Sequence, residues 1–123
     1  MNRPYDKSPK KIIFLDRDGV INKFPGMGHY VTSLKSFRFL PNVKKAIALL
    51  TKNNYEIYVI SNQGCVSRGL ITVEGLDKIT ARMLRSVQAA GGAIKKVFYC
   101  IHQTSDRCEC KKPKIKFFGR RKK

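Results

Sequence analysis

Two carboxylates, Asp16 and Asp18, follow directly after the apolar residues 12–15. Like charges this close repel each other unless a cation or a shared proton stabilises them. The pair suits phosphoryl chemistry, in which Asp16 attacks phosphorus and Asp18 donates and accepts the proton, with both carboxylates at a hard ion such as Mg²⁺. An Asp-x-Asp-Gly sequence is also an ordinary turn at the end of a strand, so the spacing alone leaves both interpretations open.

A second polar segment, residues 61–64, follows the apolar run 55–60. It begins with Ser61, a small hydroxyl followed by loop N–H groups, and such donors suit an oxygen of a phosphoryl group. Because the carboxyl ends of parallel strands meet at one edge of a sheet, we expect Ser61 to lie near Asp16. An ordinary Ser-Asn turn is the alternative.

Three thiols and one imidazole lie close together near the C-terminal end, at Cys100, His102, Cys108 and Cys110. This is a complete Cys₃His set for tetrahedral Zn²⁺, with no ligand position left for a substrate. The spacing favours structural zinc over disulfides or incidental thiols. The remaining cysteine, Cys65, has no partner nearby in the sequence and is expected to be a small packed residue.

The strands that must position these residues are predicted over 12–15, 55–60 and 94–101, the first of them buried on both faces. Helices are predicted between them, one from about Pro41 to residue 52 and one from about 73 to 90, with Thr72 as its N-cap. Their apolar stripes comprise Val43, Ala46, Ile47 and Leu50, and Leu76, Ile79, Met83, Val87 and Ala90. Strand, helix, strand, helix, strand predicts an α/β three-layer fold with a parallel sheet.

The net charge of the 123 residues is +18, and eight basic residues follow Cys110 without one acidic residue. A field of this sign attracts anions in general, from phosphorylated metabolites to nucleic acids. No apolar run is long enough to span a membrane, and residues 1–11 lack the apolar core of a signal peptide, so we expect a cytoplasmic protein without a membrane partner. Oligomeric state cannot be read from the sequence.

The string Phe-Leu-Asp-Arg-Asp-Gly-Val-Ile-Asn, residues 14–22, resembles the first motif of the haloacid dehalogenase-like hydrolases. More narrowly, it resembles the subgroup that contains D,D-heptose 1,7-bisphosphate phosphatase and histidinol phosphatase. The resemblance implies a Rossmann-like fold and a nucleophilic Asp16 that forms an aspartyl-phosphate. It also implies that Asp18 protonates the leaving group and then activates water.

Further motifs of that subgroup recur in order. The second motif is resembled by residues 61–64 together with Arg68, Gly69 and Thr72. The Cys₃His cluster also occurs in the subgroup. The basic third motif is resembled by residues 111–114. The resemblance makes Ser61 and Lys112 catalytic residues beside the two aspartates. It implies substrate contacts from Arg17, Tyr30, Asn62, Gln63, Gly64 and Lys111.

The match runs from residue 11 to 114 and then ends, and no acidic residue follows Glu109 to supply the family's fourth motif, Gly-Asp-x-x-x-Asp. We therefore expect weakened Mg²⁺ binding. We also expect the strand at 12–15 to become an apolar edge and the chain to be a truncated gene product. The expected organisation is a disordered segment 1–10, a partial phosphatase domain 11–114 with a zinc loop 100–110, and a basic tail 115–123.

The sequence thus predicts a Mg²⁺-dependent phosphomonoester hydrolase acting on a sugar bisphosphate of the D-glycero-D-manno-heptose 1,7-bisphosphate type, at its 7-phosphate. Histidinol phosphate is the alternative substrate. An inactive remnant and a basic zinc-stapled module that binds nucleic acid are the alternatives of other classes. Specific nucleic-acid binding is not expected, because basic tails bind polyanions without sequence preference.

Overall fold

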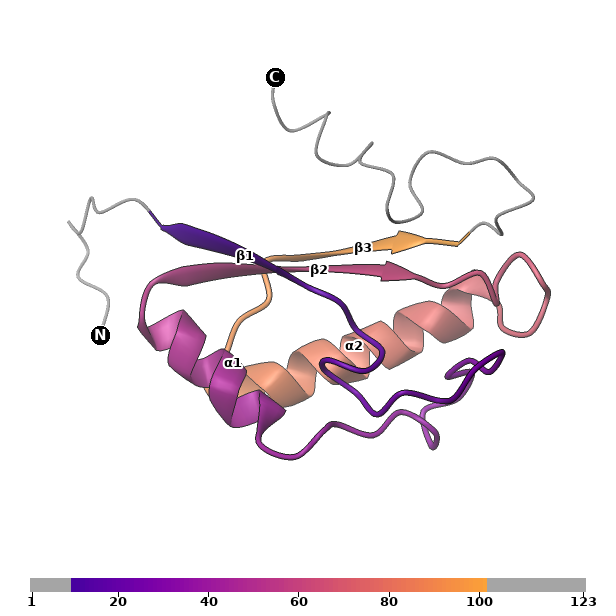
Figure 1. Cartoon of the computed structure of the whole chain (residues 1–123), viewed down its shortest axis with the longest axis horizontal. Coiled ribbons are helices and arrows are strands. Elements are labelled where there is room, and N and C mark those ends of the chain that lie inside the picture. The colour runs from indigo at the N-terminus through magenta and orange to yellow at the C-terminus, as the bar shows by residue number, and fades with distance from the viewer. Residues whose placement is uncertain (1–9, 102–123) are drawn as a thin grey trace, which may run out of the picture.

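The computed structural model describes residues 10–101 and holds the five predicted elements in the predicted order (Figure 1). They are β1 (Lys11–Leu15), α1 (Val43–Lys52), β2 (Tyr55–Asn62), α2 (Val73–Ala89) and β3 (Lys96–Cys100). The predicted segment 1–10 lies outside this range except for Lys10, and the predicted tail 115–123 lies wholly outside it. No helix among the described residues is long and apolar enough to cross a membrane.

The three strands form one parallel sheet in the order β1-β2-β3. Leu15 pairs with Val59, and Ser61 pairs with Tyr99. Since each pair of strands is joined through a helix, parallel pairing follows from the connections. The α/β class with a parallel sheet is confirmed.

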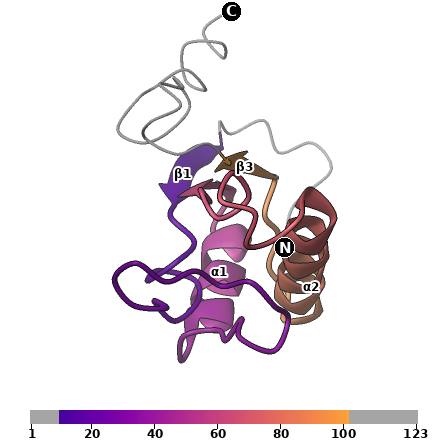
Figure 2. The same cartoon turned by 90° about the vertical axis from the view of Figure 1, so that its right-hand side faces the viewer.

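Both helices cover the same face of the sheet, as the two views show (Figures 1 and 2). Their apolar stripes face the sheet, and the core between the layers comprises Ile21, Val31, Phe37, Ile47, Ile57, Val59, Ile79, Met83 and Val87. Within residues 10–101 the fold thus has one helical layer and the sheet. The other helical layer expected of a three-layer fold is not among these residues.

Most of the predicted helix positions are confirmed. The Thr72 hydroxyl caps α2 by accepting a hydrogen bond from the Gly75 amide at 3.0 Å. Ala46 and Ala90 were predicted on the apolar stripes but are exposed. Ala90 lies beyond the last turn of α2 as its C-cap, where the backbone has left the helical path.

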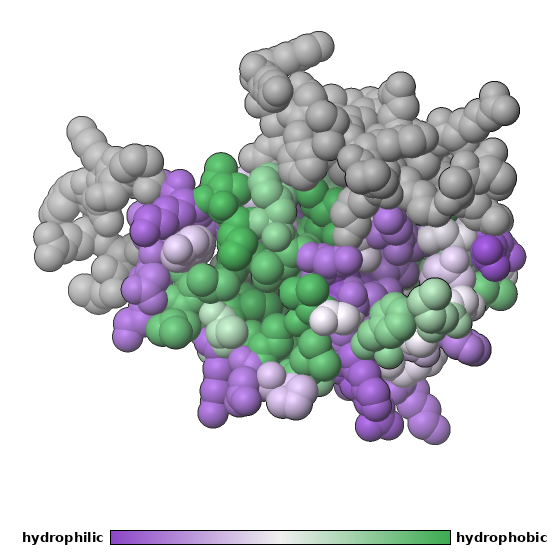
Figure 3. All heavy atoms as spheres, in the orientation of Figure 1, coloured by the Kyte–Doolittle hydropathy of each residue, from purple (hydrophilic) through white to green (hydrophobic). Residues whose placement is uncertain are grey.

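The prediction that the first strand is buried on both faces is wrong for the described chain. Ile12 is 53% exposed and Phe14 39% exposed. The reason is that Ile12 and Phe14 alternate along β1 with Ile13 and Leu15, which pack against the core, so they lie on the face of the sheet opposite both helices (Figure 1). The strand is also at the end of the strand order, which leaves one of its edges without a neighbouring strand among residues 10–101. Apolar side chains gather on the face that carries β1 (Figure 3). The predicted apolar edge is therefore present in this part of the chain.

Candidate active site

The carboxyl ends of β1 and β2 lie side by side and form the walls of one cavity. Asp16 follows the last residue of β1, and Ser61 lies near the end of β2, so parallel pairing brings both to the same edge of the sheet. The cavity has a volume of about 560 Å³. Its walls are Asp16, Asp18, Ser61 and Asn62 from the strand ends, and residues 24–30 from the loop after β1. The predicted proximity of Asp16 and Ser61 is confirmed.

Asp18 is held by donors on both of its carboxylate oxygens. Its Oδ1 accepts hydrogen bonds from Arg17 Nε and from Asn22 Nδ2, both at 3.0 Å. Its Oδ2 accepts one from Gln63 Nε2 at 3.1 Å. A carboxylate with several fixed donors keeps one orientation, as a group that transfers protons at a defined atom requires.

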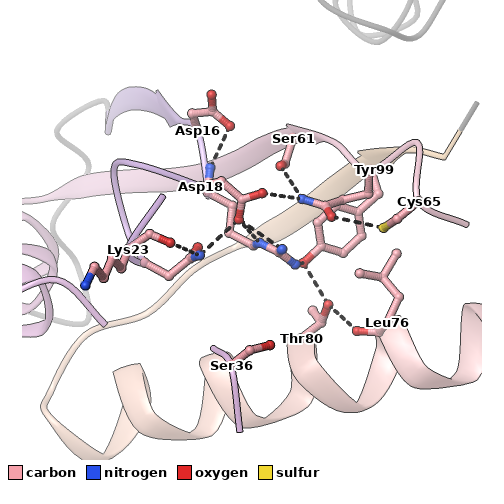
Figure 4. Close-up of polar contacts among 12 residues, drawn as sticks. Asp16, Asp18, Lys23, Ser36, Ser61, Cys65, Leu76, Thr80 and Tyr99 are labelled. Atoms are coloured by element: carbon pink, nitrogen blue, oxygen red, sulfur yellow. Dashed lines mark hydrogen bonds and ion pairs between the residues drawn. The ribbon is translucent and has the colours of Figure 1, made fainter. Parts of the chain in front are cut away.

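Asp16 has a different environment from Asp18. Its Oδ1 accepts a hydrogen bond from the Arg17 amide at 2.8 Å, and its carboxylate turns away from that of Asp18 (Figure 4). The sequence predicted that both carboxylates ligate Mg²⁺. Here protein donors engage both Asp18 oxygens, so Asp16 is the carboxylate better placed to hold an ion.

Gln63 was predicted to bind substrate, but its side chain lies fully buried beneath the cavity. Its amide nitrogen donates to Asp18 Oδ2 and to Ser61 Oγ, at 3.1 and 3.0 Å. Its backbone amide donates to the Cys100 carbonyl at 2.7 Å. Gln63 therefore links the two motifs to each other and to β3. Gly64, also a predicted substrate contact, is buried as well and is not a wall of the cavity.

Arg17 was also predicted to contact substrate, and the structure places its side chain elsewhere. It is 0% exposed and runs beneath the sheet edge, where Nη1 donates to the Tyr99 hydroxyl at 3.2 Å. Nη2 lies 3.0 Å from Asp18 Oδ1, although without hydrogen-bond geometry. Burial lowers the pKa of Arg17, but Tyr99 and Asp18 more than offset this effect, so its pKa lies above the ordinary value. Arg17 is a buried cation paired with Asp18.

The loop after β1 contributes Tyr30 to the cavity, as predicted, together with His29. The guanidinium of Arg68, which follows the second motif, lies 5.9 Å from the centre of the Tyr30 ring. Gly26 and Gly28 have positive φ angles of 108° and 74°, which a residue with a Cβ atom rarely adopts. The loop can therefore turn back over the strand ends.

The predicted zinc cluster is only partly within the described range. Cys100 ends β3 and is buried, whereas His102, Cys108 and Cys110 lie outside the described residues, as do Lys111 and Lys112. Cys65 is a buried thiol 3.7 Å from Gln63 Oε1, which confirms the expectation that it is packed. Burial raises its pKa, partly offset by Arg17.

Three polar residues of the site were not found from the sequence. Asn22 belongs to the first motif, but its contact with Asp18 was not foreseen. Tyr99 and Thr80 lie on β3 and α2, and their hydroxyls are 2.8 Å apart beside Arg17. Their positions fall within ordinary strand and helix patterns, so only the packing of α2 under the sheet reveals them.

No protein-family model matches the chain. Individual relatives do match it. The D-glycero-beta-D-manno-heptose-1,7-bisphosphate 7-phosphatase of Neisseria meningitidis serogroup A is 38% identical over 104 residues, which are 85% of this chain and 54% of that protein. The enzyme of the same name from Pseudomonas putida is 35% identical over 85% of this chain and 58% of its own length. The chain thus spans somewhat more than half the length of these curated relatives.

A solved structure that is similar to this chain belongs to a phosphatase of the same kind as these relatives. The D,D-heptose 1,7-bisphosphate phosphatase of Bordetella bronchiseptica, in complex with magnesium and phosphate, superposes with a TM-score of 0.84 at 34% identity. The superposition covers 91% of this chain and 63% of that one. The resemblance to haloacid dehalogenase-like phosphatases of the heptose bisphosphate subgroup is confirmed over the matched residues.

Proposed function

We propose that this chain carries the chemistry of the phosphatases that it resembles, the hydrolysis of the 7-phosphate of a D-glycero-D-manno-heptose 1,7-bisphosphate. One observation carries the proposal: Asp16, Asp18 and Ser61, from the ends of two parallel strands, surround one cavity in a chain similar to these phosphatases. The curated relatives bear heptose bisphosphate names, so histidinol phosphate is not the favoured substrate.

In the proposed reaction, Asp16 attacks phosphorus and the bond between phosphorus and the sugar oxygen breaks. A proton on the Asp18 carboxyl moves to the departing sugar oxygen. Water then attacks the aspartyl-phosphate and gives up its proton to Asp18, and inorganic phosphate leaves. Ser61, which is 2% exposed and lies in the cavity wall, would hold an oxygen of the transferring group by hydrogen bonding.

The donors of the cavity fit a hard cation, because they are carboxylate and hydroxyl oxygens. The Bordetella bronchiseptica structure contains magnesium. In this chain Asp16 would hold Mg²⁺, with Asp18 as the second predicted ligand. When bound, the ion would neutralise charge on the phosphoryl oxygens. Among residues 10–101 no group of three or more His, Cys, Asp or Glu side chains is placed to bind a metal, so water would complete the set.

Three parts of the proposal come from the sequence pattern: the zinc cluster, the roles of two lysines and the cytoplasmic location. Cys100, His102, Cys108 and Cys110 would bind structural Zn²⁺, which would fix the chain directly after β3. Gln63 of the second motif donates its backbone N–H to the Cys100 carbonyl, so a zinc ion bound at Cys100 would also help to hold the second motif in place. Lys112 would neutralise charge on the nucleophile and phosphoryl group, and Lys111 would contact substrate. A cytoplasmic location also remains part of the proposal.

The test is phosphate release from the heptose bisphosphate, and from histidinol phosphate in parallel, with added Mg²⁺. Asp16→Asn removes the nucleophile with little change in size, and we expect its rate to fall by at least about a thousandfold. Asp77→Asn on the exposed surface of α2 is the matched control and should keep the wild-type rate. Equal rates for the wild type and Asp16→Asn would reject the mechanism. Faster release from histidinol phosphate would reject the substrate assignment.

A further inference from the structure

A line of hydrogen-bonded side chains runs from α2 to the candidate proton-transfer residue. Thr80 on α2 lies 2.8 Å from the Tyr99 hydroxyl on β3. Tyr99 accepts from Arg17 Nη1 at 3.2 Å, and Arg17 Nε donates to Asp18 Oδ1 at 3.0 Å. Figure 4 shows this line below the sheet edge. Asp18 and Thr80 are 62 positions apart in the sequence, so the fold alone connects them.

The donors and acceptors of this line determine its direction. A guanidinium can only donate, so the Tyr99 oxygen is the acceptor from Arg17. The single hydroxyl proton of Tyr99 is then available to Thr80 Oγ1. The proton of Thr80 goes to the Leu76 carbonyl one turn earlier in α2, at 2.9 Å. The Tyr99 and Thr80 hydroxyls thus each have a place for their single proton, and each hydroxyl holds its neighbour in position.

Arg17 has two aromatic neighbours as well. Its guanidinium carbon lies 5.7 Å from the centre of the Phe37 ring and 5.5 Å from that of Tyr99. A long side chain that is fully buried between aromatic rings loses most of its rotational freedom. The hydroxyl of Tyr99 sets the rotation of the guanidinium within this space. That rotation sets the position of Nε, which is one of the two hydrogen-bond donors to Asp18 Oδ1.

We infer that Tyr99 and Thr80 are positioning residues for Asp18 and act on it through Arg17. The inference rests on the proposed function, in which Asp18 protonates the leaving oxygen. Protonation by a positioned acid matters for a poor leaving group such as a sugar alkoxide and little for a good one such as 4-nitrophenolate. If Asp18 is no longer held in position, the rate should therefore fall more for the ester with the poor leaving group than for the ester with the good one. A general loss of folded structure would lower the rates for both esters alike.

The variants for the test are Tyr99→Phe and Thr80→Val in the full chain, each of which removes one hydroxyl with little change in shape. We expect kcat/KM for the heptose bisphosphate to fall about tenfold, and kcat/KM for 4-nitrophenyl phosphate to fall less than about twofold. Both esters form the same aspartyl-phosphate. Because kcat/KM reports only the steps up to phosphoryl transfer, the later hydrolysis of this intermediate does not affect the comparison. Thr80→Ser keeps the hydroxyl, so its kcat/KM for the heptose bisphosphate should be close to that of the wild type.

Thr51→Val is the matched control. Thr51 is also a half-buried helix residue whose hydroxyl donates to the carbonyl four residues earlier, at 2.8 Å, but it lies in α1 away from Arg17. It should leave the ratio of the two kcat/KM values unchanged. Equal losses on both esters in Tyr99→Phe and Thr80→Val would overturn the inference.

A second measurement does not require turnover. In the ¹⁵N spectrum of the arginine side chains, Arg17 should give signals that exchange slowly with water, because it is fully buried. Thr80→Val does not touch Arg17, yet it should shift these signals, whereas Thr51→Val should not. Unchanged Arg17 signals in Thr80→Val would overturn the inference. If the wild type hydrolyses neither ester, the proposed function fails, and this spectrum still decides whether α2 positions Arg17.

Discussion

The guanidinium of Arg17 reaches the hydroxyl of Tyr99 across 82 positions of sequence, with 3.2 Å between Nη1 and the hydroxyl oxygen. This contact turns the side chain between the two aspartates of the first motif into the interior, although its neighbours Asp16 and Asp18 line the cavity. Arg17 therefore connects Asp18 at the edge of the sheet to Tyr99 on β3 through a buried side chain.

Arg17→Met should destabilise the chain. Methionine fills much of the space, but Asp18, whose side chain is 17% exposed, loses its buried cationic partner. Removing one member of a buried ion pair costs about 3 kcal/mol or more. Urea unfolding followed by circular dichroism measures the difference.

Arg82→Met is the control for this prediction. The Arg82 side chain is exposed, although its Nη1 donates to the Leu34 carbonyl at 3.1 Å. Exposed substitutions of this kind change stability by about 0.5 kcal/mol or less. If the two variants lost equal stability, the buried pair would have no special role.

The thiol of Cys65 should make stability depend on alkaline pH. Burial raises its pKa, so the folded chain holds the thiol proton more tightly than the unfolded chain does. The resulting stabilisation is complete below the unfolded pKa of about 8.5, and it is lost as the pH rises through the higher folded value. The unfolding free energy of the wild type should therefore fall more steeply between about pH 8 and 10 than that of Cys65→Ala.

The comparison with Cys65→Ala is necessary because lysine and tyrosine side chains also titrate in this range. They are common to both proteins, so the difference between the two pH profiles isolates the thiol. Parallel profiles would show that Cys65 has the same pKa in the folded and unfolded chain. Slow reaction of the native wild type with a thiol reagent is the companion measurement.

The full chain, purified with zinc present, should hold about one Zn²⁺ per molecule by elemental analysis. Cys108→Ser should lower the content sharply, because it removes one of four ligands. Cys65→Ser is the matched control, since Cys65 lies beside Gln63 and is not one of the predicted ligands. Zinc at the wild-type level in Cys108→Ser would contradict the cluster.

The local pattern of the chain determined its elements and their order. Four apolar residues before Asp16, and stripes at helical spacing around Ile47 and Met83, were sufficient to predict the strands and helices. Because the strands are joined through helices, parallel pairing followed, and with it the meeting of Asp16 and Ser61 at one edge. These features depend on residues close in sequence and on connectivity, which a sequence displays directly.

Only the tertiary structure decided which polar side chains face the cavity and which support it from beneath. Arg17 and Gln63 were predicted to bind substrate, yet both are fully buried, while Thr80 and Tyr99 were not singled out. A strand end does not show toward which side its long polar side chains turn. That choice is made by distant partners, because a buried polar group is stable only where its hydrogen bonds are satisfied. Here the packing of α2 beneath β3 supplies those partners.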